Sequence, residues 1–132
     1  MALDADTRRF NAEIEKFAKN LTPDEVVKLQ KKVVFDALNK ILMRTPVDTG
    51  RARGNWQVSI ANYPFGEVRS TDRGGGTTTQ KGAAALANLT PFQVVYIANN
   101  LPYIQALENG SSKQSPQGMM AVTYQELRTM FR

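Results

Sequence analysis

The sequence has no cysteine and no histidine, and no apolar run approaches the roughly 20 residues that a membrane-spanning helix needs. Without cysteine there is no disulfide framework, no thiolate nucleophile and no cysteine-ligated zinc. Without histidine the chain lacks the usual general base and the commonest transition-metal ligand. The remaining residues supply no obvious catalytic set. We therefore expect a protein that is not an enzyme and that uses no metal and no cofactor.

Length and charge are those of an ordinary folded domain. The chain has 132 residues, 42% of them apolar, which is enough for one domain over residues 1–132. The formal net charge is +5, without long runs of like charge. This excess indicates either a surface that faces phosphates or a solvated surface with a modest basic bias, and we favour the second. The first ten residues contain no apolar stretch, so we expect no secretory signal and synthesis in the cytoplasm.

A long helix is the strongest local prediction. Thr22 fits the N-cap, Pro23 fits the first helical position, and Glu25 completes a capping box. We expect this helix to run to about Arg44, because Pro46 disfavours helical backbone at the residue before it. Its apolar stripe is broad, so the helix should pack across a sheet.

Two further helices are expected near the ends of the chain. Residues 4–19 place Phe10, Ile14 and Phe17 at helical spacing. Ser115-Pro116 is typical of a helix start, and a final helix should follow it. This helix carries apolar residues on one side: Met119, Met120, Tyr124, Leu127 and Phe131.

Alternating apolar and polar residues predict a strand at about 55–62, and an apolar segment predicts a second strand at 92–98. Asn100 should cap a short helix that ends at Gly110. The predicted fold is therefore α+β: a long N-terminal helix packed on a small antiparallel sheet, with a short helix and a C-terminal helix.

A flexible loop is expected at about 70–82, between the two strands, followed by a short helical turn at 83–89. The loop holds three consecutive glycines and three threonines and has almost nothing to bury. The glycine run also suggests a phosphate-binding loop, but no Gly-Lys-Ser/Thr follows it. We favour a mobile loop tip at Arg73, Gly74, Gly75, Gly76 and Thr77.

The segment TPVDTGRARGNWQ, residues 45–57, contains the Asp-Thr-Gly of aspartic proteases. In those enzymes the motif is followed by alanine in a strand-flanked loop, whereas here Arg51 follows it and a long helix precedes it. We therefore interpret Asp48 as the cap of a short turn over Thr49–Arg53 rather than as a catalyst.

The segment NNLPYIQALENGSSKQSPQGMM, residues 99–120, places Glu108 near the C-terminal end of a short helix, where the helix dipole disfavours an anion. Its carboxylate is then either solvated or held by Arg51 or Arg53. Tyr96 and Tyr103 are either half-buried or anchors of an interface. Met119, Met120 and Trp56 are interpreted as core residues.

In their joint order and spacing, these motifs resemble the head–tail joining proteins of tailed phages, the small neck or tail-completion proteins. Members have a Pro-Val-Asp-Thr-Gly-Arg element, a Trp-led strand, Tyr-Ile-x-Asn-x-x-Pro-Tyr, Leu-Glu-x-Gly, Ser-x-Gln-x-Pro and Gly-Met. The matching positions are Pro46 to Arg51, Trp56, Tyr96 to Asn99, Pro102-Tyr103, Leu107-Glu108, Gly110, Ser112, Gln114, Pro116 and Gly118-Met119. Ser115 stands where alanine is expected. The resemblance covers most of residues 22–131.

The resemblance implies a non-enzymatic virion component that is made in the host cytoplasm. Members form a homo-oligomeric ring, typically of six copies, around the axis through which DNA leaves the head. The ring joins a head-completion or adaptor protein to the tail terminator or tail tube, and DNA passes through it without sequence-specific binding. A ring requires a different patch on each side of the subunit.

The two motif segments are the expected patches, lying close together near the subunit interface, with an ion pair from Arg51 or Arg53 to Glu108. The candidate interface residues are Asp48, Thr49, Arg51, Arg53, Tyr103, Glu108, Gly110, Ser112, Gln114 and Pro116. The glycine-threonine loop would be an arm that orders on docking with a neighbouring ring. Two alternatives remain: a tail terminator ring that caps the tail tube, and a basic nucleic-acid-binding module whose binding weakens steeply with salt.

Overall fold

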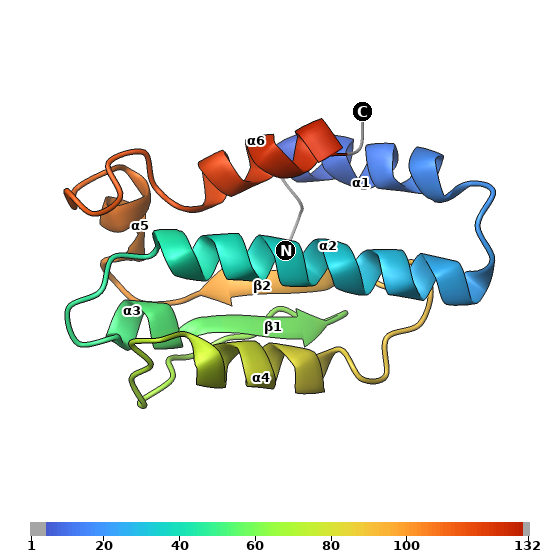
Figure 1. Cartoon of the computed structure of the whole chain (residues 1–132). Coiled ribbons are helices and arrows are strands. Elements are labelled where there is room, and N and C mark those ends of the chain that lie inside the picture. The colour runs from blue at the N-terminus through green and yellow to red at the C-terminus, as the bar shows by residue number, and fades with distance from the viewer. Residues whose placement is uncertain (1–4, 131–132) are drawn as a thin grey trace.

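A computed structural model gives the fold of residues 5–130, which are the residues that it describes. Six helices and two strands follow one another in this range: α1 (Ala5–Ala18), α2 (Pro23–Arg44), α3 (Arg51–Gly54), β1 (Trp56–Ile60), α4 (Gly76–Ala85), β2 (Val95–Asn99), α5 (Ile104–Glu108) and α6 (Met120–Met130). The predicted α+β class is confirmed (Figure 1). Phe131, expected on the last helix, lies outside the described residues.

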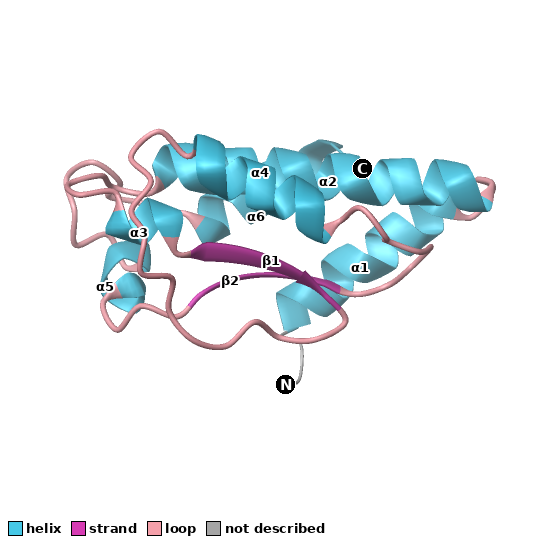
Figure 2. Cartoon of the chain, turned by 90° about the horizontal axis from the view of Figure 1, so that it is seen from below, coloured by secondary structure: helices cyan, strands magenta, loops and turns pink. Residues whose placement is uncertain are grey.

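The two strands form an antiparallel pair in which Trp56 lies opposite Asn99, Val58 opposite Ile97 and Ile60 opposite Val95. Helices α2, α4 and α6 lie together on one side of this pair, and loops cross its other face (Figure 2). Within residues 5–130, no helix combines the length and the apolar character that crossing a bilayer requires.

The core lies between α2 and the sheet, as the apolar stripe of α2 predicts. Its buried members are Leu38, Ile41, Leu42, Trp56 and Met119, with Val58, Ile97, Ile104 and Leu107 packed against them. Met119 is completely buried, whereas Met120 is 40% exposed. The two methionines therefore divide between core and surface, and the prediction of a core role is wrong for Met120.

Both ends of α2 agree with the sequence. The Thr22 hydroxyl accepts the Glu25 backbone N–H, and the Glu25 carboxylate accepts the Thr22 N–H, so the capping box is complete. At the other end, the buried Thr45 hydroxyl donates to the Ile41 carbonyl at 2.6 Å and accepts the Trp56 indole N–H at 2.8 Å. This chain of two hydrogen bonds fixes the only tryptophan against the end of the helix.

The prediction of a flexible loop over 70–82 is wrong for residues 76–82, which form most of α4. The Asp72 carboxylate accepts the backbone N–H of Gly75 and both the N–H and the hydroxyl of Thr78, so it satisfies donors at the start of the helix. Gly82 faces Leu38 so closely that a Cβ would lie 2.8 Å from a Leu38 methyl group. A helix of small residues can therefore pack directly on α2 without a large apolar face of its own.

The second strand begins at Val95 rather than at residue 92. Phe92 has a φ of +64°, which takes the chain out of the extended conformation just before β2. Gln30 of α2 holds this bend, because its side chain accepts the Phe92 N–H and donates to the Gln93 carbonyl. The expected start at 92 ignored this long-range contact.

Candidate contact surface of the two motif segments

The Asp-Thr-Gly turn between α2 and α3 is held by Thr49 and Gly50 rather than by Asp48. The Thr49 hydroxyl accepts the Arg51 N–H, and the N-cap of α3 is Gly50, with no side-chain cap. The interpretation of Asp48 as the cap is therefore wrong, and its side chain is exposed. Gly50 has a φ of +91°, and a Cβ there would lie 2.6 Å from the Arg73 nitrogen. Only glycine fits where this turn packs on the segment that starts α4.

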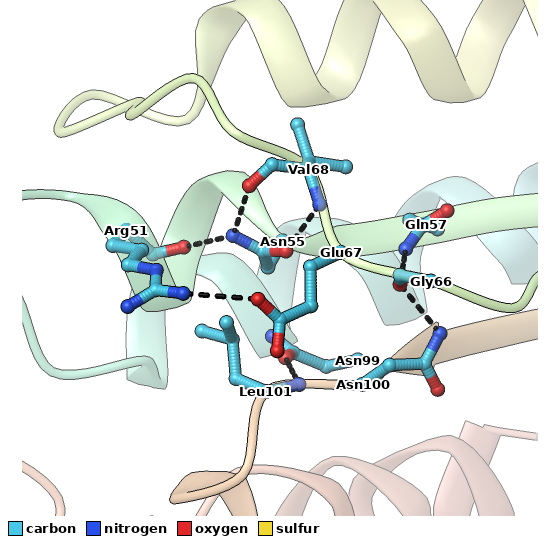
Figure 3. A network of polar contacts seen from close by, with 9 residues as sticks. All are labelled: Arg51, Asn55, Gln57, Gly66, Glu67, Val68, Asn99, Asn100 and Leu101. Carbon is cyan, nitrogen blue, oxygen red and sulfur yellow. Dashed lines mark hydrogen bonds and ion pairs between the residues drawn. The ribbon is translucent and has the colours of Figure 1, made fainter.

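Neither arginine of the first segment pairs with Glu108. Arg51 forms an ion pair with Glu67 at 3.0 Å (Figure 3). Arg53 donates to the carbonyls of Arg73 and Thr45 and so ties the start of α4 to the end of α2. The expected pair is wrong because both guanidinium groups have partners on the neighbouring loop.

A buried amide, Asn55, fixes that neighbouring loop, and sequence reasoning missed it. Asn55 is fully buried; its side-chain nitrogen donates to the Arg51 and Val68 carbonyls, and its oxygen accepts the Val68 N–H (Figure 3). These three hydrogen bonds of the Asn55 side chain are all made with backbone groups, one on α3 and two on the loop after β1. Only the position of an asparagine directly before a strand hinted at this role.

The same loop is held at its tip by Asn100, which was expected to cap the short helix. Instead, the Asn100 amide donates to the Pro64 and Gly66 carbonyls and its oxygen accepts the Tyr63 hydroxyl. Gln57 donates to the same Gly66 carbonyl (Figure 3). The N-cap of α5 is Tyr103, without a side-chain hydrogen bond, so the expected cap at Asn100 is wrong.

Gly110 ends α5 as predicted. Its φ is +88°, its N–H bonds to the Leu107 carbonyl, and the Ser111 N–H bonds to the Ala106 carbonyl. These two bonds make a Schellman motif, the glycine-dependent way to close a helix. A Cβ on Gly110 would also lie 2.2 Å from the Pro116 carbonyl oxygen. Gly110 therefore both ends the helix and lets the chain fold back on itself.

Glu108 is the cap of the final helix. One carboxylate oxygen accepts the N–H groups of Met119 and Met120 at 3.0 and 2.8 Å, and the other accepts that of Ala121 at 3.1 Å. The last helix therefore begins at Met120 rather than after Ser115, whose hydroxyl donates to the Gly118 carbonyl. The dipole of α5 disfavours a carboxylate at Glu108, but the positive end of α6 meets it. Both alternatives that the sequence left open, a solvated carboxylate and a pair with Arg51 or Arg53, are therefore wrong, because the partners are backbone N–H groups.

The two motif segments do lie close together, as expected. Gln114 Oε1 accepts the Val47 N–H at 2.9 Å, and Gln114 Nε2 donates to the Val47 carbonyl at 3.2 Å. Between the segments is a hollow of about 300 Å³. Six of the candidate interface residues line it: Asp48, Thr49, Arg51, Tyr103, Ser112 and Gln114.

The other four candidate residues do not line this hollow. Arg53 binds backbone carbonyls, Glu108 caps α6, and Gly110 packs against Pro116. Their motif positions are therefore explained by the contacts that they make within the chain. The exposed Asp48, Thr49, Arg51 and Tyr103, by contrast, present polar and aromatic groups outward.

The carboxylate of Asp72, at the start of α4, has a shifted pKa. Desolvation raises the pKa of the Asp72 carboxyl, but the hydrogen bonds from Thr78 and Gly75 and the charge of Arg53 outweigh it, so the pKa lies below its ordinary value. Over residues 5–130, no three carboxylates gather as a metal ion would require.

Comparison with known proteins gives no relative. No family model matches the chain, and no curated protein and no solved structure matches it either.

Proposed function

We propose that this chain is a structural virion protein of a tailed bacteriophage neck, forming a ring that joins the head to the tail. The proposal starts from the resemblance of the two motif segments to head–tail joining proteins. The observation that carries it is the contact between these segments, which lie 67 positions apart at Gln114 and Val47 and together line one hollow.

The geometry supports a contact role for this surface. Internal hydrogen bonds hold both segments, so their outward groups are presented in a defined arrangement before a partner arrives. Such pre-organisation lowers the entropic cost of association. Tyr103, 41% exposed on the rim of the hollow, is the kind of aromatic side chain that anchors protein interfaces. In this proposal the surface contacts the next copy in the ring or the adjoining head adaptor.

The first experiment is to locate the chain in purified particles. Imaging of the particle neck, with mass analysis of its rings, should find several symmetry-related copies between the head adaptor and the tail. Absence of the chain from the particles would contradict the proposal. If head–tail joining is blocked and the ring is then found on the unjoined tail tubes, this result would indicate the tail terminator instead.

The second experiment separates contact from folding. Tyr103→Ala and Asp48→Lys should lower the yield of joined particles while the free protein keeps its melting temperature, because both side chains are exposed. Lys81→Ala, at an exposed position of α4, is the matched control and should leave the yield unchanged. Equal yields from all three variants would contradict a role for this surface.

The alternative of a nucleic-acid-binding module is tested on the free protein. Binding to duplex DNA that falls steeply between low and physiological salt would favour it. The neck proposal predicts only weak, non-specific attraction from the net charge of +5.

A further inference from the structure

Helix α1 is loosely joined to the rest of the described chain. Helix α2 packs closely against α4 and α6, whereas α1 approaches no described element to the same extent. Figure 1 shows α1 beside α6, at the edge of the molecule. Two side-chain contacts between these helices are an edge-on pair of the Phe10 and Tyr124 rings, with centroids 5.8 Å apart, and an ion pair of Glu13 and Arg128 at 3.2 Å.

A hollow of about 300 Å³ lies under α1. One face of α1 lines it with Thr7, Phe10, Asn11 and Ile14, and the opposite walls come from α2, β2 and α6. The lining is mostly apolar. Apolar side chains that border empty space lose dispersion contacts. The groove under α1 is therefore incompletely filled by α1. A helix that is packed in this way is released more easily than one that is fully packed.

The connection to α2 permits α1 to move as a unit. Residues 19–22 join the two helices, and Thr22 has extended backbone with ψ 161°. Because Pro23 follows, Thr22 does not adopt helical backbone readily, so α1 and α2 do not merge into one helix. The capping box of Thr22 and Glu25 lies on the α2 side of this connection. Helix α2 therefore keeps its own N-terminus when α1 leaves its groove.

We propose that α1 is an exchangeable arm, and that the groove formed by α2, β2 and α6 accepts the α1 of a second copy of this chain. The charges are complementary by construction: the arm carries Glu13 and the groove carries Arg128, and every copy has both. An exchanged helix makes the same contacts in the second copy that it makes within its own chain, so exchange is a low-cost route to association.

Two copies that exchange arms with each other form a closed dimer, whereas exchange among more copies gives an asymmetric contact. A copy that gives its arm on one side and receives an arm at its groove joins its neighbours head to tail. Contacts of this kind close into rings or continue as filaments. The inference goes beyond the proposed function, because it concerns copies of this chain alone and holds without any head or tail partner.

The test uses the absence of native cysteine, which makes each introduced thiol unique. Purified Glu13→Cys is mixed at high concentration with size-tagged Arg128→Cys, and a short bismaleimide is added. Exchange predicts covalent heterodimers as the main product, decreasing on dilution. The matched control mixes Lys113→Cys, an exposed position on the loop before α6, with the same tagged Arg128→Cys. Heterodimer no more abundant than in this control overturns the proposal.

A second pair of cysteine variants keeps the test valid if the Arg128 variant fails to fold. The contacts of Phe10 with Tyr124 and of Glu13 with Arg128 run in parallel along the two helices, so Thr7 is expected beside Met120 one turn earlier. Both residues line the hollow, and Met120 is 40% exposed. Thr7→Cys mixed with Met120→Cys should give the same heterodimers. With both thiols in one chain, a cross-link that stays within single chains at every concentration overturns the proposal.

Discussion

The side chain of Gln114 pairs with the backbone of Val47 through both of its polar atoms, accepting the N–H at 2.9 Å and donating to the carbonyl at 3.2 Å. A carboxamide used in this way reproduces the pairing between two peptide groups. The turn after α2 and the loop before α6 are therefore joined as two neighbouring strands would be, although neither is a strand.

This pairing predicts a local effect with little change in global stability. Gln114 is exposed, so Gln114→Ala should lower the free energy of unfolding by no more than about 1 kcal/mol. The Val47 amide proton, which loses its acceptor, should exchange with solvent faster in hydrogen-exchange NMR. Gln117→Ala, on the same loop and also exposed, is the control and should leave Val47 unaffected. Unchanged Val47 exchange in Gln114→Ala would contradict the contact.

The cap at Glu108 predicts a larger effect. Glu108→Ala removes the acceptor of three N–H groups at the start of α6, and the expected loss is about 1–2 kcal/mol of unfolding free energy in urea denaturation. Glu108→Gln keeps one acceptor oxygen, so its free energy of unfolding should lie between those of the wild type and Glu108→Ala. The comparison is Glu67→Gln, an exposed carboxylate that pairs only across the surface to Arg51, for which we expect under about 1 kcal/mol. Equal losses at both positions would show that the cap contributes nothing special.

Three left-handed glycines offer a matched series. Alanine at Gly110 or Gly118 would place Cβ 2.2 Å from the Pro116 carbonyl oxygen or 2.3 Å from the Glu108 carbonyl oxygen. Backbone strain and overpacking then add, and each variant should lose about 2–5 kcal/mol. Gly66 has a similar φ of +88° with open space around it, so Gly66→Ala should lose only about 1–2 kcal/mol. Thermal melts of the three variants test the order, and a Gly66 variant as unstable as the others would refute it.

Asp72 predicts a dependence on acid. Its folded-state pKa lies below the ordinary value of 3.8, so its contribution to stability is complete above that value and disappears as pH falls through the lower folded-state pKa. Urea denaturation at pH 6 and across the range below about pH 4 should therefore show α4 weakening in acid. In Asp72→Asn, which cannot ionise, this part of the pH dependence should be absent. A wild-type and a variant curve of the same shape would rule Asp72 out as its source.

The elements that local chemistry decides were predictable from the sequence. The capping box at Thr22 and the glycine at residue 110 act within a few positions of themselves, and both helix ends were confirmed. The start of α4 was missed because Asp72, which accepts N–H groups at the start of this helix, precedes a glycine run that has no apolar pattern. Small residues make a poor sequence signal, but they suit a helix that packs directly against Leu38.

The side-chain partners of the motif residues could not be read from spacing. Glu108 was expected to be solvated or paired with Arg51 or Arg53, whereas its partners are backbone N–H groups that begin at Met119, eleven positions later. Arg51 and Arg53 had several acceptors within reach, and the loop that supplies Glu67 and the Arg73 carbonyl had no predicted position. The juxtaposition of the two segments, through Gln114 and Val47, was a long-range prediction that is confirmed, as was the packing of α2 against the sheet.

The carboxylate of Glu108 also has a mechanical consequence. It is the last residue of α5, and through three backbone N–H groups it holds the first turn of α6. A load applied to the C-terminal helix is thus transmitted to α5 through a single side chain, without having to stretch the intervening residues 109–118. Displacement of one helix would therefore move the other with it, while Gln114 anchors the loop between them to Val47.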